Sequence, residues 1–298
     1  MVALVGMYLG YLALAFLPPL LWLFFFLHED RHPEPKHLLL ATFVAGIVSA
    51  FVAFVAEFAL FSEPLVDFAG KVMFGGGILY RLFPATFGSC DFSSAAILAG
   101  GLAGCAILFL GIAFVEEYVK YFAVKLVALS RVEFDEPVDA MIYMVTAGLG
   151  FAAIENAFFI FSGLPDLGAN GSVYLAANRF MGANLLHGLA SGLVGYALAR
   201  HVFSPWRRHA LASGIAFATV LHALFNYLII KKSVEAIRIE LYAAATPFYQ
   251  TPLFWLLLVG ALLVFMGIAV LAEFERLRRR NDRRMNPVTA QPSGSDYR

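Results

Sequence analysis

Apolar runs of roughly 20 residues recur along the chain between short polar stretches. A helix of that length crosses the ~30 Å hydrocarbon core of a bilayer. The pattern therefore predicts an all-α, polytopic transmembrane helical bundle with about seven spans. The spans are expected near residues 3–27, 38–61, 93–129, 138–163, 178–202, 208–230 and 252–273.

Two regions do not fit one simple crossing each. The run 93–129 is too long for a single span, and the segment 64–91 contains three consecutive glycines and two prolines. We expect 64–91 to be re-entrant or interfacial, and an eighth crossing stays open as an alternative.

The composition also indicates a membrane protein. Of 298 residues, 61% are hydrophobic and 14% are charged, and the mean hydropathy is +0.77. A soluble domain is less apolar than this. We expect one transmembrane domain over 1–280, with its catalytic segment at about 105–230, and a disordered cytoplasmic tail over 281–298. The two cysteines predict neither a disulfide framework nor a thiolate metal site, and no nucleic-acid motif occurs.

Positive charges predict the orientation of the chain in the cell membrane. Six arginines lie between Arg276 and Arg284, and cytoplasmic flanks of membrane proteins are enriched in Lys and Arg. We therefore expect the N-terminus outside and the C-terminus in the cytoplasm. The segment 231–251 alternates charged and apolar residues, which predicts an amphipathic piece on the membrane surface.

Ionisable and amide side chains interrupt several of the apolar runs. They are Glu116, Glu117, Lys120, Glu155, Asn156, His187, His222 and Asn226. A charged side chain at the centre of a spanning helix costs roughly 2.5 to 3.5 kcal/mol, so four unpaired charges would cost on the order of 10 kcal/mol. These groups are expected to meet one another in a shared polar cavity.

Depth along the predicted helices supports this convergence. Glu155, His187 and His222 each lie about eight or nine residues from the outer end of their span, or roughly 13 Å at 1.5 Å per residue. Glu116 joins this layer only if the embedded part of its long run is about 105–128. Small residues at Gly148 and Ala152 share a helix face with Glu155, which predicts a close helix interface there.

Such a set of side chains suits hydrolysis in two ways. A buried carboxylate can take a proton from water while a neutral histidine holds that water, and a second histidine with Asn226 can donate to an oxyanion. Alternatively, Glu116, His187 and His222 could bind a divalent metal such as zinc with water in the fourth position. None of the predicted spans contains a His-Glu-x-x-His sequence, so zinc is signalled less directly for this cluster.

Five strings resemble the PrsW family of intramembrane proteases. They are Val115-Glu116-Glu117-Tyr118-Val119-Lys120, Glu136-Pro137-Val138-Asp139, Gly148 to Asn156, His187, and Leu221-His222-Ala223-Leu224-Phe225-Asn226. The resemblance covers about 115–226 and is shared with the larger CAAX-endopeptidase and bacteriocin-processing superfamily. It departs at Ala140, where family members commonly have glycine.

This resemblance implies an intramembrane endopeptidase that cuts a membrane-anchored protein, an anti-sigma factor in the family's case, on its extracytoplasmic side. Carried over residue by residue, Glu116 would be the general base with Glu117 as its tuning partner. His187 would position the water, and His222 with Asn226 would donate to the oxyanion. Glu155 and Asn156 match the family's Glu-Asn motif without an assigned role.

Other interpretations remain at this stage. A proton-coupled transporter could use the same buried Glu and His residues, a haem protein could use the two histidines as axial ligands, and a silent scaffold could present substrates. Lys120 could simply pair with Glu117, three residues away. Glu57 is interpreted as a capping or interface residue, and the charged loop 28–37 as a solvated connector.

Overall fold

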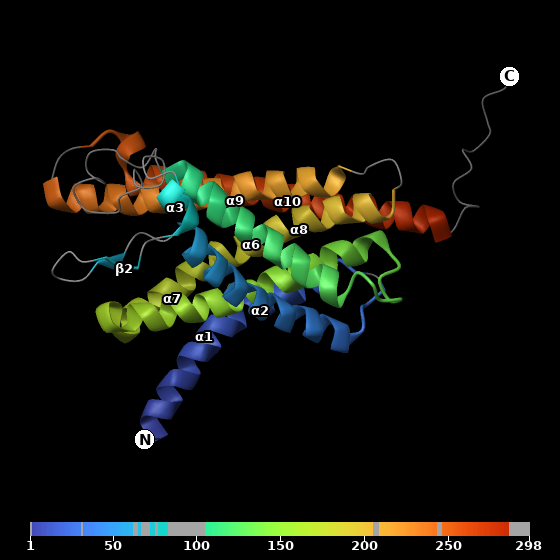
Figure 1. Cartoon of the computed structure of the whole chain (residues 1–298), viewed down its shortest axis with the longest axis horizontal. Coiled ribbons are helices and arrows are strands. Elements are labelled where there is room, and N and C mark those ends of the chain that lie inside the picture. Colours follow the sequence, from blue (N-terminus) through green and yellow to red (C-terminus); the bar gives the residue numbers. More distant parts are fainter. Residues whose placement is uncertain are drawn as a thin grey trace.

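The long helices pack side by side into one bundle in the computed structural model (Figure 1). The structure describes residues 2–30, 32–61, 65–66, 72–74, 77–82, 105–204, 209–242 and 246–285. Within these residues all elements are helical except a small antiparallel strand pair, so the all-α prediction is confirmed. The elements are α1 (Val2–Leu27), α2 (Lys36–Phe61), β1 (Leu65–Val66), β2 (Val72–Phe74), α3 (Ile78–Leu82), α6 (Cys105–Val127), α7 (Pro137–Met181), α8 (Ala183–Val202), α9 (Ala210–Tyr242), the short 3₁₀ helix η2 (Phe248–Gln250) and α10 (Pro252–Met285).

Five of these helices are long and apolar enough to cross a membrane. The qualifying segments are Val5–Leu27, Lys36–Phe61, Pro137–Leu164, Ala210–Glu240 and Pro252–Asn281. The two other predicted spans correspond to α6 and α8, which are more polar because they carry site residues. Helix α8 is mostly buried and packs on α7 and α9, whereas α6 packs on α2 and α9 with the face that carries Glu116, Glu117 and Lys120 and exposes its opposite, apolar face. Polar side chains that face protein partners avoid lipid, which is why these two helices tolerate them.

Helix α6 is described from Cys105 to Val127. Cys105 is disulfide-bonded, which corrects the expectation that the cysteines play no such part. Residues 83–104, which include the other cysteine, lie outside the described residues. The described pieces of 64–91 are short strands and α3, none of them long enough to cross a bilayer.

Helix α7 turns back on itself at Gly168, which has φ 62° and ψ −170°. This positive φ is readily available only to glycine, so the chain reverses direction there without a long loop. The returning arm, residues 169–181, lies against the first part of α7, because Arg179 bonds Glu155. A second break at Gly182 precedes α8. The predicted single span 178–202 is therefore two helical pieces.

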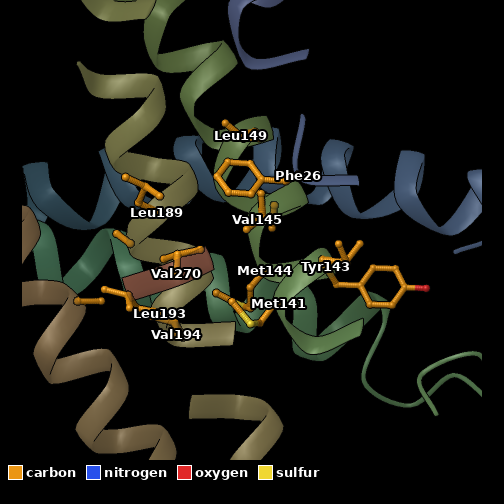
Figure 2. Close-up of a cluster of buried hydrophobic side chains, with 14 of the residues drawn as sticks. Phe26, Met141, Tyr143, Met144, Val145, Leu149, Leu189, Leu193, Val194 and Val270 are labelled. Carbon is orange, nitrogen blue, oxygen red and sulfur yellow. The ribbon is translucent and has the colours of Figure 1, made fainter. Parts of the chain in front are cut away.

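Glycines bring α7 close to its neighbours. A methyl group on Gly148 would lie 2.2 Å from Ser191 Oγ of α8, and one on Gly150 would lie 2.1 Å from the Phe43 carbonyl of α2. The predicted tight interface beside Glu155 is thus present. Figure 2 shows the apolar core below it, where Phe26, Met141, Leu189 and Val270 come from four different helices.

Two predictions about the ends of helices are wrong. Residues 231–242 do not form a separate surface segment but continue α9, since no proline interrupts the helix before Pro247. Residues 281–285 of the predicted tail belong to α10, and 286–298 lie outside the described residues.

The loop between α1 and α2 is also more structured than a solvated connector. Glu34 is buried, and the Tyr143 hydroxyl of α7 donates a hydrogen bond to it. Burial raises the pKa of the Glu34 carboxyl above its usual range. His32 approaches Glu136 at 3.0 Å, so the loop is held against the start of α7.

Candidate active site

Glu116, His187 and His222 come from three helices and meet inside the bundle. One carboxylate oxygen and one ring nitrogen from each histidine all lie within 4.8 Å of one another. The three side chains are nearly inaccessible to solvent, with exposures of 6%, 2% and 2%. The convergence predicted from helix depth is therefore observed.

Each histidine is held at its far nitrogen by a carboxylate. His222 Nδ1 lies 2.8 Å from Glu117 Oε1, and His187 Nε2 lies 2.7 Å from Glu155 Oε2. A carboxylate accepts hydrogen bonds, so these ring nitrogens carry the protons. The unprotonated nitrogens, His222 Nε2 and His187 Nδ1, face Glu116 Oε2 at 3.8 and 3.9 Å.

Lys120 is the cation at the centre of this group. Its Nζ donates to Glu117 Oε1 at 2.8 Å and to His187 Nδ1 at 2.9 Å, and lies 3.6 Å from Glu116 Oε2. The helical spacing of three and four residues places both glutamates on its side of α6. Lys120 is fully buried over the Phe151 ring. It is therefore more than the partner of Glu117 that the spacing indicated.

Arg179 is a site residue that the sequence analysis missed. Its guanidinium donates to Glu155 Oε2 at 2.8 Å and to Asn156 Oδ1 at 2.6 Å. Asn156 in turn donates to Asn184 Oδ1 and to the Ala15 carbonyl of α1. The signal was available, since Arg179 is an isolated cation at the start of a predicted span. Glu155 and Asn156 thus link the reversed arm of α7 to α1 and α8.

The Glu116 carboxylate has an orphaned oxygen. Its Oε2 atom is buried and has no hydrogen-bond partner among the described residues. A buried carboxylate oxygen without a donor is costly, and two unprotonated imidazole nitrogens face the same point. His187 Nδ1 also accepts the hydrogen bond from Lys120, which a metal at this point would have to replace. One carboxylate and two neutral imidazoles are a donor set that zinc accepts. The residues present therefore fit a divalent metal ion.

A large cavity of about 1510 Å³ adjoins these groups. Its walls are mainly apolar and come from α1, α2, α6, α7, α8, α9 and α10. Asn226, one turn after His222, is half-buried on this wall. Glu57 also lines the cavity, which corrects its interpretation as a capping or interface residue.

Comparisons with known proteins agree with this site. A model of the PrsW family intramembrane metalloproteases matches residues 34–257. The chain belongs to this family. The match extends well beyond the 115–226 region of the motifs, and it includes α2. No solved structure matches the chain.

Three proteases of the PrsW family are similar to this chain over most of their own length. Protease PrsW of Geobacillus kaustophilus is 29% identical over 210 residues, covering 70% of this chain and 74% of the relative. Protease PrsW of Halalkalibacterium halodurans is 26% identical over 208 residues, covering 70% and 77%. Protease PrsW of Bacillus subtilis is 21% identical over 208 residues, covering 69% and 76%.

The prediction of a multi-pass intramembrane protease is confirmed by this assignment. The family consists of intramembrane metalloproteases. The protein therefore works in a lipid bilayer on a membrane protein substrate. The alternative of a proton-coupled transporter finds no support in the family or its relatives.

Proposed function

We propose that this PrsW family protease hydrolyses a peptide bond of a membrane-anchored protein with a divalent metal held by Glu116, His187 and His222. One observation carries the proposal. The two histidines bind carboxylates through their far nitrogens, and their near nitrogens face the orphaned oxygen of Glu116. Carboxylates that orient metal-binding histidines in this way are typical of metal sites. Zinc is the preferred candidate because it accepts nitrogen and oxygen ligands and keeps an open position in catalytic sites.

The charge of the cluster supports a divalent cation. Four carboxylates, from Glu57, Glu116, Glu117 and Glu155, oppose two permanent cations, Lys120 and Arg179. If all of them are ionised and both histidines are neutral, two negative charges remain in excess. In surroundings of low dielectric constant such an excess is unfavourable. One divalent ion would balance it.

The surrounding residues have separate roles in this proposal. Glu117 and Glu155 fix the tautomer and the direction of the two imidazoles, and Arg179 holds Glu155 in place. Asn226 is placed to donate a hydrogen bond to the carbonyl oxygen of the scissile bond. A metal bound here would supply Lewis-acid chemistry, polarising that carbonyl and activating water.

The substrate would reach the site through the membrane or from its outer face. The cavity walls are mainly apolar, which suits a peptide segment in hydrocarbon. The disulfide at Cys105 supports an extracytoplasmic position for the start of α6, because disulfides persist in oxidising compartments. That position agrees with an outside N-terminus and a cytoplasmic C-terminus. An anti-sigma-factor-like substrate stays a prediction.

Metal analysis of the purified protein, together with cleavage of a co-expressed membrane-anchored reporter, tests the proposal. We expect about one metal ion per chain, loss of cleavage with a chelator, and loss of both metal and cleavage in Glu116→Gln and His222→Gln. Glu235→Gln is the matched control, since Glu235 is a buried glutamate paired with Lys231 away from the site. Full cleavage by metal-free protein would reject the metal set.

A further inference from the structure

Glu57 is a carboxylate of the cavity that the proposed metal set does not use. It lies on the face of α2 that lines the cavity, in line with Ala50 and Ala53 at helical spacing. Its Oε1 atom is buried and has no hydrogen-bond partner in the described part of the chain. A carboxylate in hydrocarbon is expensive, so one without a structural partner calls for a functional explanation.

The packing of α2 on α6 places Glu57 at the level of Glu116. A methyl group on Gly111 of α6 would lie 2.5 Å from the Phe61 ring of α2. Glu57 is about one helical turn below Phe61, and Glu116 is a little more than one turn beyond Gly111. The end of α2 at Phe61 lies beside the early part of α6 at Gly111. One turn back along α2 and one turn forward along α6 therefore reach a similar depth. Glu57 interacts electrostatically with Glu155, Lys120 and Glu116.

The other carboxylates of the site are already engaged. Glu117 is fully buried and accepts hydrogen bonds from Lys120 and His222. Glu155 accepts from His187 and from Arg179, which neutralises it. If Glu116 is a metal ligand, none of these three is free to take a proton from the attacking water. Among the described residues that line the cavity, Glu57 is the remaining carboxylate.

We propose that Glu57 is the general base of the reaction, an inference that rests on the proposed metal set. The Glu57 carboxylate takes one proton from water as the water oxygen bonds to the scissile carbonyl carbon. The same proton then passes to the leaving nitrogen as the carbon–nitrogen bond breaks, giving a carboxylic acid and an amine. Glu57 returns to its ionised form, so the step needs no further reactant.

Glu57→Gln tests this role, because glutamine keeps the size of the side chain and cannot accept the proton. We expect kcat to fall by about 10² to 10⁴-fold, the usual contribution of a general base. Zinc content and zinc Kd should stay within twofold of the wild-type values. The acidic limb of the kcat/KM profile against pH should disappear, while Glu116, Glu155 and Lys120, the ionisable groups facing Glu57, are unchanged. Glu235→Gln again serves as the control.

A second variant keeps the test decisive if glutamine disturbs the fold. Glu57→Gly leaves space for a small carboxylate, and added formate should restore part of the activity in this variant but not in Glu116→Gly. Activity of Glu57→Gln within threefold of wild type, or loss of zinc from it, would overturn the assignment. Failure of the metal set itself is recognised separately, since Glu116→Gln would then retain its metal.

Discussion

Replacing Glu155 by glutamine tests whether a carboxylate that holds the far nitrogen of a histidine controls metal binding. Glu155 accepts the Nε2 proton of His187 at 2.7 Å, and nothing else in the described residues bonds that nitrogen. Glutamine presents a neutral oxygen, so the ring is held less firmly and its Nδ1 becomes a poorer donor to a metal. Changes of this type usually cost 10 to 100-fold in metal affinity, or about 1.4 to 2.7 kcal/mol.

Glu155 is a cleaner position for this test than Glu117. Glu117 is completely buried and also pairs with Lys120 at 2.8 Å, so its loss leaves a buried ammonium poorly compensated. Breaking such a pair costs about 3 to 5 kcal/mol and endangers the fold. The Glu155 side chain is 25% exposed, and Arg179 keeps its bond to Asn156 when the carboxylate is removed.

The assay is competition for zinc between the purified protein and a fluorescent chelator. We expect the zinc Kd of Glu155→Gln to rise by 10 to 100-fold while the thermal unfolding midpoint changes little. A double-mutant cycle with His187→Gln checks the route of the effect. If Glu155 acts through His187, the double variant binds zinc no more weakly than His187→Gln alone. Additive losses, or an unchanged Kd in Glu155→Gln, would refute the reasoning.

Three further predictions use other parts of the structure. Gly148→Val should lower stability by about 1 to 3 kcal/mol, seen as a lower unfolding midpoint, because its Cβ would lie 2.2 Å from Ser191 Oγ. Lys120→Met should tighten zinc binding by more than about tenfold, measured by the same competition, because the ammonium lies 2.9 Å from His187 Nδ1 and repels a cation there. Burial raises the pKa of Glu34, so the folded state loses stability as pH rises from about 4.5 through that raised value; Glu34→Gln should flatten the dependence of the unfolding midpoint on pH.

The convergence of the site was predictable because the rise of a helix fixes depth. Counting residues from the ends of apolar runs predicts that Glu155, His187 and His222 lie in one layer, and the structure brings Glu116 together with the two histidines. The count needs no knowledge of how the helices pack. Polar residues in hydrocarbon must find one another, so a common depth was sufficient.

Features that depend on a single backbone conformation or contact were not predictable. The reversal of α7 occurs at one residue, Gly168, where a loop had been expected, and it delivers Arg179 to Glu155. The continuation of α9 to Tyr242 is not evident from the sequence, because charged residues such as those of 231–242 also occur in amphipathic segments on a membrane surface. Glu57 was misjudged because its meaning depends on which face of α2 packs against α6.

The way the two histidines are held explains why the cluster carries more acids than a metal needs as ligands. A neutral imidazole can present either nitrogen, and in hydrocarbon there is no bulk water to select the tautomer. Glu155 and Glu117 select the tautomer by accepting the proton of the far nitrogen of His187 and His222. Both near nitrogens are therefore unprotonated before any ligand arrives. This preorganisation predicts that removing the Glu155 carboxylate weakens metal binding and leaves the fold nearly intact. Removing the Glu116 carboxylate, a metal ligand, should abolish binding. Equal losses from Glu155→Gln and Glu116→Gln would contradict the distinction.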